Sequence, residues 1–167
     1  MRMEKQYPFQ DYQYRAFEAA YKEAQAAFEN DEVPVGAAII YQQNILTSER
    51  NRIVELRDPT AHAELLAIKK AASLIQNERL NECELVTTLE PCAMCSGAII
   101  LARIPVVYYL AEDEKLPALR SVCALKGHNH IPEMHYVNAH EFAAKELLQK
   151  FFKNKREVKS IQARDKN

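Results

Sequence analysis

The chain has 167 residues, 48% of them hydrophobic, and a formal net charge of −1. A chain of this length can bury roughly two-thirds of the surface that it exposes when unfolded, so we expect residues 1–167 to form a single domain that needs no disulfide bonds. The near-neutral charge excludes a global basic field for nucleic acids and leaves room only for a local basic patch. Because the sequence contains neither a signal-peptide pattern nor an apolar run as long as a membrane span, it predicts a cytoplasmic protein without membrane contact.

The first half of the chain predicts two helices separated by a pair of strands. Apolar residues recur at three- and four-residue steps from Tyr14 to Phe28, which is typical of an amphipathic helix. Asp58-Pro59-Thr60 is a helix-start signal ahead of a segment with an apolar stripe. The predicted elements are a helix over 14–28, strands over 35–41 and 45–49, and a helix over 61–75.

The second half continues the alternation of strands and helices. Pro91 indicates a helix start, because proline is tolerated where the backbone N–H would be unpaired anyway. Strands that alternate with helices predict an α/β fold, a three-layer sandwich with helices on both faces of one sheet. The predicted elements are strands over 85–89, 106–110 and 134–137, and helices over 92–102, near 116–125 and over 139–159.

Two short segments at predicted helix starts carry residues that bind metals. Cys92 and Cys95 are one helical turn apart, so both sulfur atoms can face the same point, and a helix N-terminus stabilises the thiolate form that binds zinc. His62 supplies a nitrogen ligand from the other segment. Three protein ligands leave the fourth tetrahedral position open for water, which is the arrangement of catalytic zinc. We therefore expect one Zn²⁺ per chain.

Glu64, two residues after His62, completes the predicted site. Two thiolates already neutralise Zn²⁺, so a nearby carboxylate that does not bind the metal can take a proton from water and hold it for a departing amine. A purely structural zinc site would usually close with a fourth Cys or His. Cys83 and Cys123 have no partner at ligand spacing, and we expect them to be small buried hydrophobic residues.

With these residues the sequence resembles the cytidine/deoxycytidylate deaminase superfamily and, within it, the bacterial tRNA-specific adenosine deaminases. The pattern His-x-Glu followed by Pro-Cys-x-x-Cys is the signature of zinc nucleobase deaminases. The similarity extends from about Tyr14 to Lys159. The matching segments are Glu32-Val-Pro-Val-Gly-Ala37, Asn51-Arg52, Asp58-Pro-Thr-Ala-His-Ala-Glu64, Thr88-Leu-Glu-Pro-Cys92, Met94-Cys95, Gly97-Ala98, Arg103-Ile104, Asn129-His130 and Phe151-Phe152.

The resemblance implies a mixed five-stranded sheet of the cytidine deaminase type and a homodimer. It implies that His62, Cys92 and Cys95 bind zinc, that Glu64 is the catalytic proton shuttle, and that adenosine becomes inosine at the wobble position of a tRNA. It also implies that Asn51 forms a hydrogen bond with the base and that the backbone around Ala63 and Pro34 helps to hold the base in the pocket. The small apolar stretch from Ala98 to Ala102 is the expected dimer contact.

Two other functions are compatible with the sequence. Residues 115–121 read Lys-Leu-Pro-Ala-Leu-Arg-Ser, where the family has a glycine-containing loop, and this difference favours a free base, nucleoside or nucleotide as substrate. The third alternative is a non-catalytic RNA-binding subunit with structural zinc, which Glu64 argues against. Basic residues in this loop and near the C-terminus favour RNA, because they can contact phosphates; they are Lys115, Lys153, Arg156 and Lys159.

Overall fold

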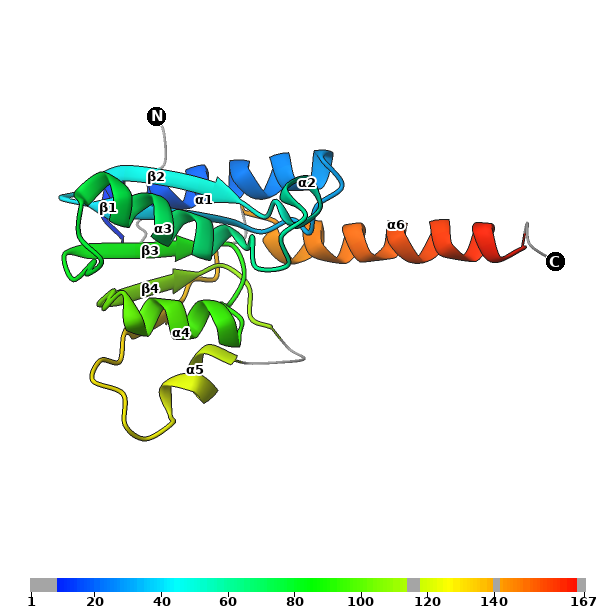
Figure 1. Cartoon of the computed structure of the whole chain (residues 1–167). Coiled ribbons are helices and arrows are strands. Elements are labelled where there is room, and N and C mark those ends of the chain that lie inside the picture. The colour runs from blue at the N-terminus through cyan, green and yellow to red at the C-terminus, as the bar shows by residue number, and fades with distance from the viewer. Residues whose placement is uncertain (1–8, 114–117, 140–141, 165–167) are drawn as a thin grey trace, which may run out of the picture.

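A mixed five-stranded sheet with helices on both of its faces forms the centre of the protein (Figure 1). The computed structural model describes residues 9–113, 118–139 and 142–164. The strand order is β2-β1-β3-β4-β5; β1 is antiparallel to β2 and β3, whereas β3, β4 and β5 are parallel to one another. The strands are β1 (Gly36–Tyr41), β2 (Asn44–Arg50), β3 (Cys83–Thr87), β4 (Val106–Tyr109) and β5 (Glu133–Tyr136). This architecture confirms the predicted three-layer α/β fold.

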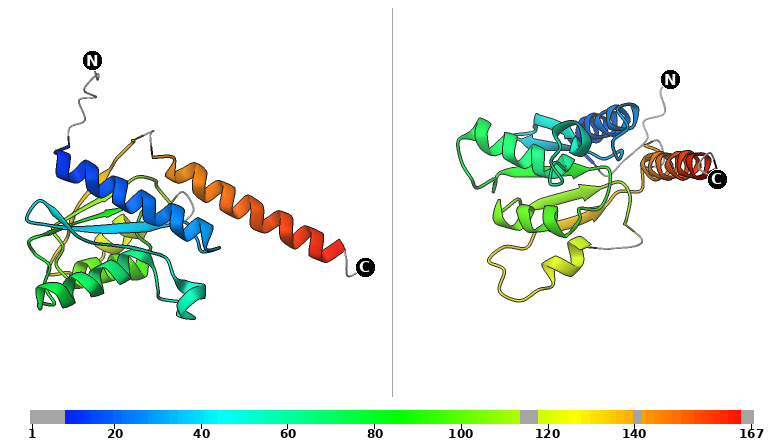
Figure 2. Two further views of the ribbon diagram at one scale, coloured as in Figure 1. Left: turned by 90° about the horizontal axis from the view of Figure 1, so that it is seen from above. Right: turned by 45° about the vertical axis from the view of Figure 1, so that its right-hand side comes forward.

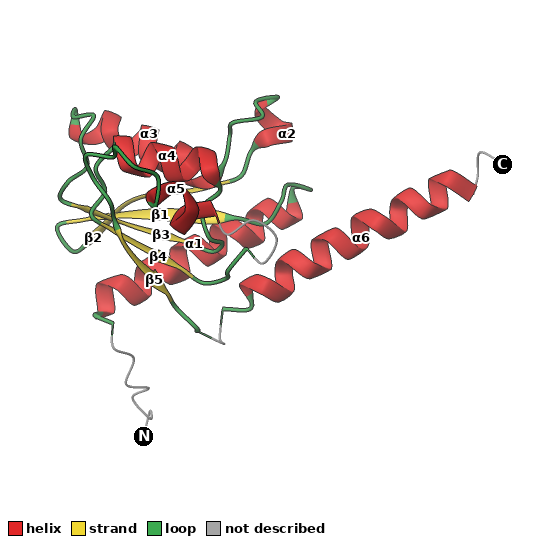
Figure 3. Cartoon of the chain, turned by 90° about the horizontal axis from the view of Figure 1, so that it is seen from below, coloured by secondary structure: helices red, strands yellow, loops and turns green. Residues whose placement is uncertain are grey.

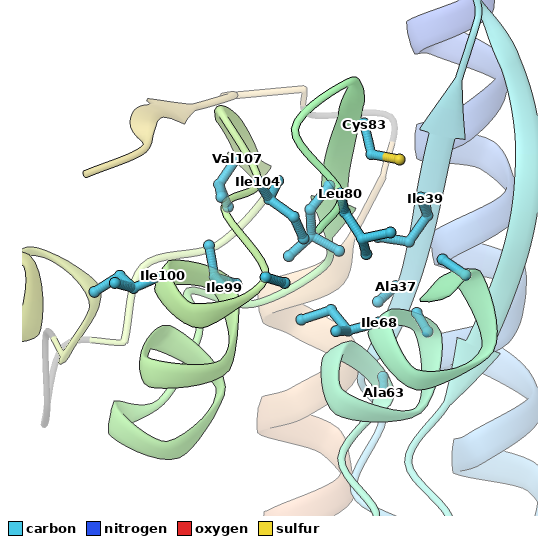
Figure 4. Close-up of a cluster of buried hydrophobic side chains, with 14 of the residues drawn as sticks. Ala37, Ile39, Ala63, Ile68, Leu80, Cys83, Ile99, Ile100, Ile104 and Val107 are labelled. Atoms are coloured by element: carbon cyan, nitrogen blue, oxygen red, sulfur yellow. The ribbon is translucent and has the colours of Figure 1, made fainter. Parts of the chain in front are cut away.

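One face of the sheet is covered by α3 (Ala63–Ile75) and α4 (Ala93–Leu101), with the short helix α5 (Ala118–Cys123) beside α4 (Figure 3). Helix α3 turns a row of fully buried alanines toward the sheet, which lets its backbone come close to the strands; they are Ala63, Ala67 and Ala71. The strands contribute Ile39, Leu85 and Val107 to this core, and these three residues are paired across neighbouring strands. Ile39 and Val107 are labelled in Figure 4. Close packing of this layer fixes the helix that begins beside His62.

The opposite face is covered by α1 (Asp11–Glu29) and by the start of α6 (Ala144–Arg164). Helix α1 approaches β1 so closely that a Cβ on Gly36 would lie 2.0 Å from Ala20 O, so only glycine fits there. The aromatic rings of Phe28 and Phe151 meet with their centroids 6.1 Å apart, which joins the end of α1 to α6. Beyond this contact α6 projects past the sheet (Figure 2).

Several element boundaries differ from the predictions, most of all at the last helix, and one short helix was not predicted. The last helix begins at Ala144, not at residue 139, because Phe142 packs instead against the rings of Tyr14, Phe17 and Tyr21 on α1. The second long helix begins at Ala63, not at residue 61, with His62 as its N-cap residue. A short helix, α2 (Ile53–Leu56), was not predicted, because none of its residues is buried and it has no apolar periodicity.

The two cysteines outside the candidate metal cluster are buried in the core. Cys83 is 1% exposed and Cys123 is 4% exposed, and both belong to the core between the sheet and α3 and α4, as predicted. Across the described part of the chain, no helix has the length and apolar character needed to cross a membrane. The predicted helix near residue 116 is α5; residues 114–117 lie outside the described residues.

Candidate active site

The starts of α3 and α4 meet at one point and bring three potential metal ligands together. His62 is the N-cap residue of α3, Cys92 is the N-cap residue of α4, and Cys95 lies in the first turn of α4. The Nδ1 atom of His62 is 3.6 Å from the Sγ atom of Cys92 and 3.8 Å from that of Cys95. Tetrahedral zinc with ordinary bond lengths separates a nitrogen and a sulfur ligand by about 3.6 Å. The spacing of these donor atoms therefore fits Zn²⁺.

The protonation of the two thiols agrees with a cation site. The pKa of Cys92 is lowered to about 4, first by a hydrogen bond from Cys95 and then by its hydrogen bond with His62, against the opposing effect of burial. The pKa of Cys95 is raised, first because of its hydrogen bond with Cys92 and then because of burial. The pKa of His62 is raised by its hydrogen bond with Cys92. The pair thus shares a proton in a position where a bound cation would stabilise two thiolates.

Glu64 lies in the first turn of α3, next to the cluster but outside the set of ligands. It is 3% exposed, and its Oε2 atom is buried without a hydrogen-bond partner among the described residues. Burial is the main cause that raises the pKa of this carboxyl group to about 7. An unpartnered buried oxygen is costly unless a bound group satisfies it, so this carboxylate also indicates a site built for a ligand.

The three predicted substrate contacts lie together behind the cluster. Asn51 is 4% exposed, and its Oδ1 accepts a hydrogen bond from the backbone N–H of Ala63 at 2.8 Å. The backbone N–H of Asn51 donates to the carbonyl oxygen of Val35 at 3.1 Å, next to the buried residue Pro34. The Ala63 N–H is thus already paired with Asn51, which leaves the Asn51 amide as a donor; no described residue accepts a hydrogen bond from its Nδ2 atom.

A groove of about 500 Å³, which the sequence did not reveal, lies between the loop after β4 and helix α6. It includes Leu89, three residues before Cys92, and Arg156 from α6. Lys153 and Lys159 are exposed on the same helix, whereas Lys115 lies outside the described residues. Because four segments that are separated in sequence line the groove, no local sequence pattern predicts it. The lining residues are Val33, Leu89, Ala111, Glu112, Asp113, Lys145, Leu148, Gln149, Phe152 and Arg156.

The fold and the donor set are those of a zinc-binding deaminase. Residues 11–111 match the family described as the cytidine and deoxycytidylate deaminase zinc-binding region. The chain belongs to this family. The described residues contain one group of three or more side chains that could hold a metal, namely His62, Cys92 and Cys95.

One relative and two solved structures are similar to this chain over most of its length. The chain is 45% identical over 140 residues to the tRNA-specific adenosine deaminase of Aquifex aeolicus, which covers 82% of this chain and 91% of that protein. A solved structure from a study of A-to-I editing by tRNA:A34 deaminases at the wobble position of transfer RNA is 38% identical and has a TM-score of 0.72, covering 75% of this chain and 98% of the other. The guanine deaminase of Nitrosomonas europaea has a TM-score of 0.66 over 81% of this chain and 82% of its own; at 22% identity it shows the fold alone.

Proposed function

We propose that this protein deaminates adenosine to inosine, by hydrolysis, at the wobble position in the anticodon loop of a tRNA. The observation that carries the chemistry is the unpartnered Oε2 of buried Glu64 beside the cluster of His62, Cys92 and Cys95. The choice of substrate is supported by two relatives that are 45% and 40% identical over 82% and 83% of this chain, because both are tRNA-specific adenosine deaminases.

Each residue of the site has a separate role in this proposal. Zn²⁺ held by His62, Cys92 and Cys95 would lower the pKa of a water molecule and so supply a nucleophile at neutral pH. Glu64 takes the proton of the water on Oε2 and passes it to the departing amine, because its burial keeps bulk water from competing. Asn51 donates from Nδ2 to the base, and its Oδ1 stays on the Ala63 N–H. The buried backbone around Pro34 seats the base from the other side.

The groove beside α6 supports the proposal that the RNA backbone binds next to the site. Arg156 lines the groove, while the exposed Lys153 and Lys159 extend the positive charge along the helix. Lysine and arginine side chains bind phosphates through charge, which makes the binding sensitive to salt. Lys115 is part of the same proposal on sequence grounds alone.

We also propose a cytoplasmic homodimer in which each chain is one deaminase domain. Within the expected contact stretch from Ala98 to Ala102, Ile99, Ile100 and Ala102 are buried in the chain's own core and cannot form the contact. The exposed apolar side chains of α4 support the dimer instead, because Leu101 is 81% exposed and Met94 is 36% exposed. Apolar area of this kind marks contact surfaces. Light scattering at micromolar concentration should give the mass of two chains, and Leu101→Glu should shift it toward one; a wild-type monomer would contradict the proposal.

The experiment that tests the function compares substrates for the purified zinc-loaded protein. We expect inosine in a tRNA anticodon stem-loop, with far less product from free adenosine, guanine, cytosine or their nucleotides. Efficient deamination of a free base with no reaction on the stem-loop would instead support the small-molecule function that residues 115–121 favour.

A further inference from the structure

A buried carboxylate outside the metal cluster joins two parts of the chain that are distant in sequence. Glu32 lies between α1 and β1 and is only 2% exposed. Its Oε1 accepts hydrogen bonds from the backbone N–H groups of Val54, at 2.8 Å, and Glu55, at 2.9 Å. Its own backbone N–H donates to the carbonyl oxygen of Ala27 on α1 at 2.9 Å. Glu32 therefore links the end of α1 to the start of α2.

Helix α2 has no other visible support of this kind. None of its residues is buried, and Val54 is 71% exposed, so apolar packing does not hold it in place. Among the described residues, no other side chain from outside 51–62 forms a hydrogen bond with the α2 backbone. The other link from α2 to the sheet, the ion pair between Glu55 and Arg50 of β2 at 3.3 Å, is partly exposed to water and therefore weak. The position of α2 therefore depends mainly on the buried carboxylate of Glu32.

The segment that carries α2 leads directly into the candidate active site at both of its ends. At its base the Arg52 N–H donates to the Ala61 carbonyl oxygen at 3.0 Å, and the Ala63 N–H donates to Asn51 Oδ1 at 2.8 Å. Residues 51–62 thus form a closed loop that begins at Asn51 and ends at the metal ligand His62. Because α2 lies within this loop, we expect a shift of α2 to change the position of Asn51 relative to His62.

We propose that Glu32 is a positioning residue, whose carboxylate holds residues 51–62 in the conformation that places Asn51 against α3 for substrate binding. Glu32 acts through Asn51 and not on the reacting atoms. The inference rests on the proposed function only in stating that Asn51 binds the substrate. The two hydrogen bonds from α2 to Glu32, which we call the clamp, are independent of that function.

The form of the clamp predicts which substitutions it tolerates. Both N–H groups donate to the same oxygen, Oε1, so an amide oxygen in Glu32→Gln can accept both bonds. Glu32→Asp shortens the side chain by one methylene group and withdraws the carboxylate, and Glu32→Ala removes it. Glu84→Ala is the matched control, because Glu84 is also a carboxylate that accepts two hydrogen bonds. They come from the side chains of Tyr12 and Gln13, on the face of the sheet away from α3 and α4.

The test combines hydrogen exchange, zinc content and steady-state kinetics on the full-length, zinc-loaded variants. In Glu32→Ala and Glu32→Asp we expect amides of residues 53–56 to exchange at least about tenfold faster and the KM for the anticodon stem-loop to rise by about tenfold or more, since leaving a partly buried backbone donor without its acceptor changes an equilibrium by that order. We expect kcat to change by less than about threefold and zinc to stay at one ion per chain. Glu32→Gln should restore both exchange and KM.

Three results would overturn the inference. The first is wild-type exchange and KM in both Glu32→Ala and Glu32→Asp. The second is failure of Glu32→Gln to restore them, which would make charge and not hydrogen bonding the cause. The third is an equal rise in KM in Glu84→Ala, which would reflect general loss of stability. If Glu32→Ala does not fold, Glu32→Asp and Glu32→Gln decide. If the wild-type protein does not deaminate the stem-loop, the proposed function fails, while exchange at residues 53–56 still tests the clamp.

Discussion

The metal cluster and the projecting half of α6 are built under different physical constraints. The ligand atoms of the cluster lie within 4.8 Å of one another at the starts of two helices packed against the sheet, and Glu64 beside them is 3% exposed. The far half of α6 extends beyond the sheet, and its basic residues are mostly exposed (Figure 2). Packing holds the ligand atoms of the cluster in fixed positions. The exposed side chains of α6 provide positive charge without fixed positions. Substitutions in the cluster should therefore abolish deamination, while those on α6 should lower the affinity for RNA gradually.

The largest effect should come from removal of the two thiols. Cys92→Ser with Cys95→Ser takes away two of the three ligand atoms, so we expect loss of zinc after extensive dialysis and no measurable deamination. Metal analysis checks this directly, with Cys123→Ala as the control, because Cys123 is buried away from the cluster and should not alter zinc content. Full zinc retention in the double variant would show that the metal is bound elsewhere.

Removal of the carboxylate should be nearly as severe and should leave the metal in place. General acid–base catalysis contributes about a hundred- to ten-thousand-fold, and Glu64 would serve two proton transfers, so Glu64→Ala should lower kcat by at least about ten-thousand-fold. Glu64→Gln keeps the shape of the side chain and should lose as much. Activity of either variant within tenfold of wild type would contradict the proton-shuttle role.

Charge reversal on α6 should have a moderate effect that depends on the substrate. Lys153→Glu, Arg156→Glu and Lys159→Glu together should raise the KM for RNA by about tenfold or more, flatten its dependence on salt, and leave kinetics on a free nucleoside unchanged. The matched control reverses three exposed lysines on other elements, namely Lys22, Lys69 and Lys126. An equal effect of the control triple variant would mean that net charge, and not this helix, determines RNA binding.

The smallest effect should appear in the stability of the face opposite the metal cluster. Burial raises the pKa of Tyr108 to about 12, and its hydroxyl accepts a hydrogen bond from Gln13 at 2.7 Å. A phenol whose pKa is higher in the folded state stabilises the fold below its unfolded pKa, near 10, and this contribution disappears as the pH rises toward 12. The free energy of unfolding should therefore fall by on the order of 1–3 kcal/mol over that window.

Denaturation curves across the same pH range, for wild type and Tyr108→Phe, measure this contribution. Tyr108→Phe should be less stable at neutral pH and should show a shallower alkaline decline. Tyr136, which is 45% exposed, provides the control Tyr136→Phe. Identical alkaline slopes in wild type and Tyr108→Phe would assign the decline to other groups.

The same contrast explains what could be predicted from the sequence. The strands, the long helices and the cluster were predictable, because apolar periodicity and the spacing of Cys92 and Cys95 are local signals. Helix α2 was not, since its support comes from Glu32, more than twenty positions earlier in the chain. The groove beside α6 was missed for the same reason: Leu89 and Arg156 are neighbours only in the folded chain. The prediction of α6 began too early because it included Phe142, whose ring packs against α1 and does not belong to the helix.

The central claim, hydrolytic deamination of adenosine in an RNA loop by the cluster and Glu64, is tested most directly with isotopically labelled water. The zinc-loaded protein is incubated with a tRNA anticodon stem-loop in oxygen-18 water. The RNA is then digested to nucleosides, and their masses are measured by mass spectrometry. We expect inosine at the wobble position that carries one oxygen atom from the solvent, and none with Glu64→Ala. Unchanged adenosine with the wild-type protein, or labelled inosine formed equally well by Glu64→Ala, would contradict the account.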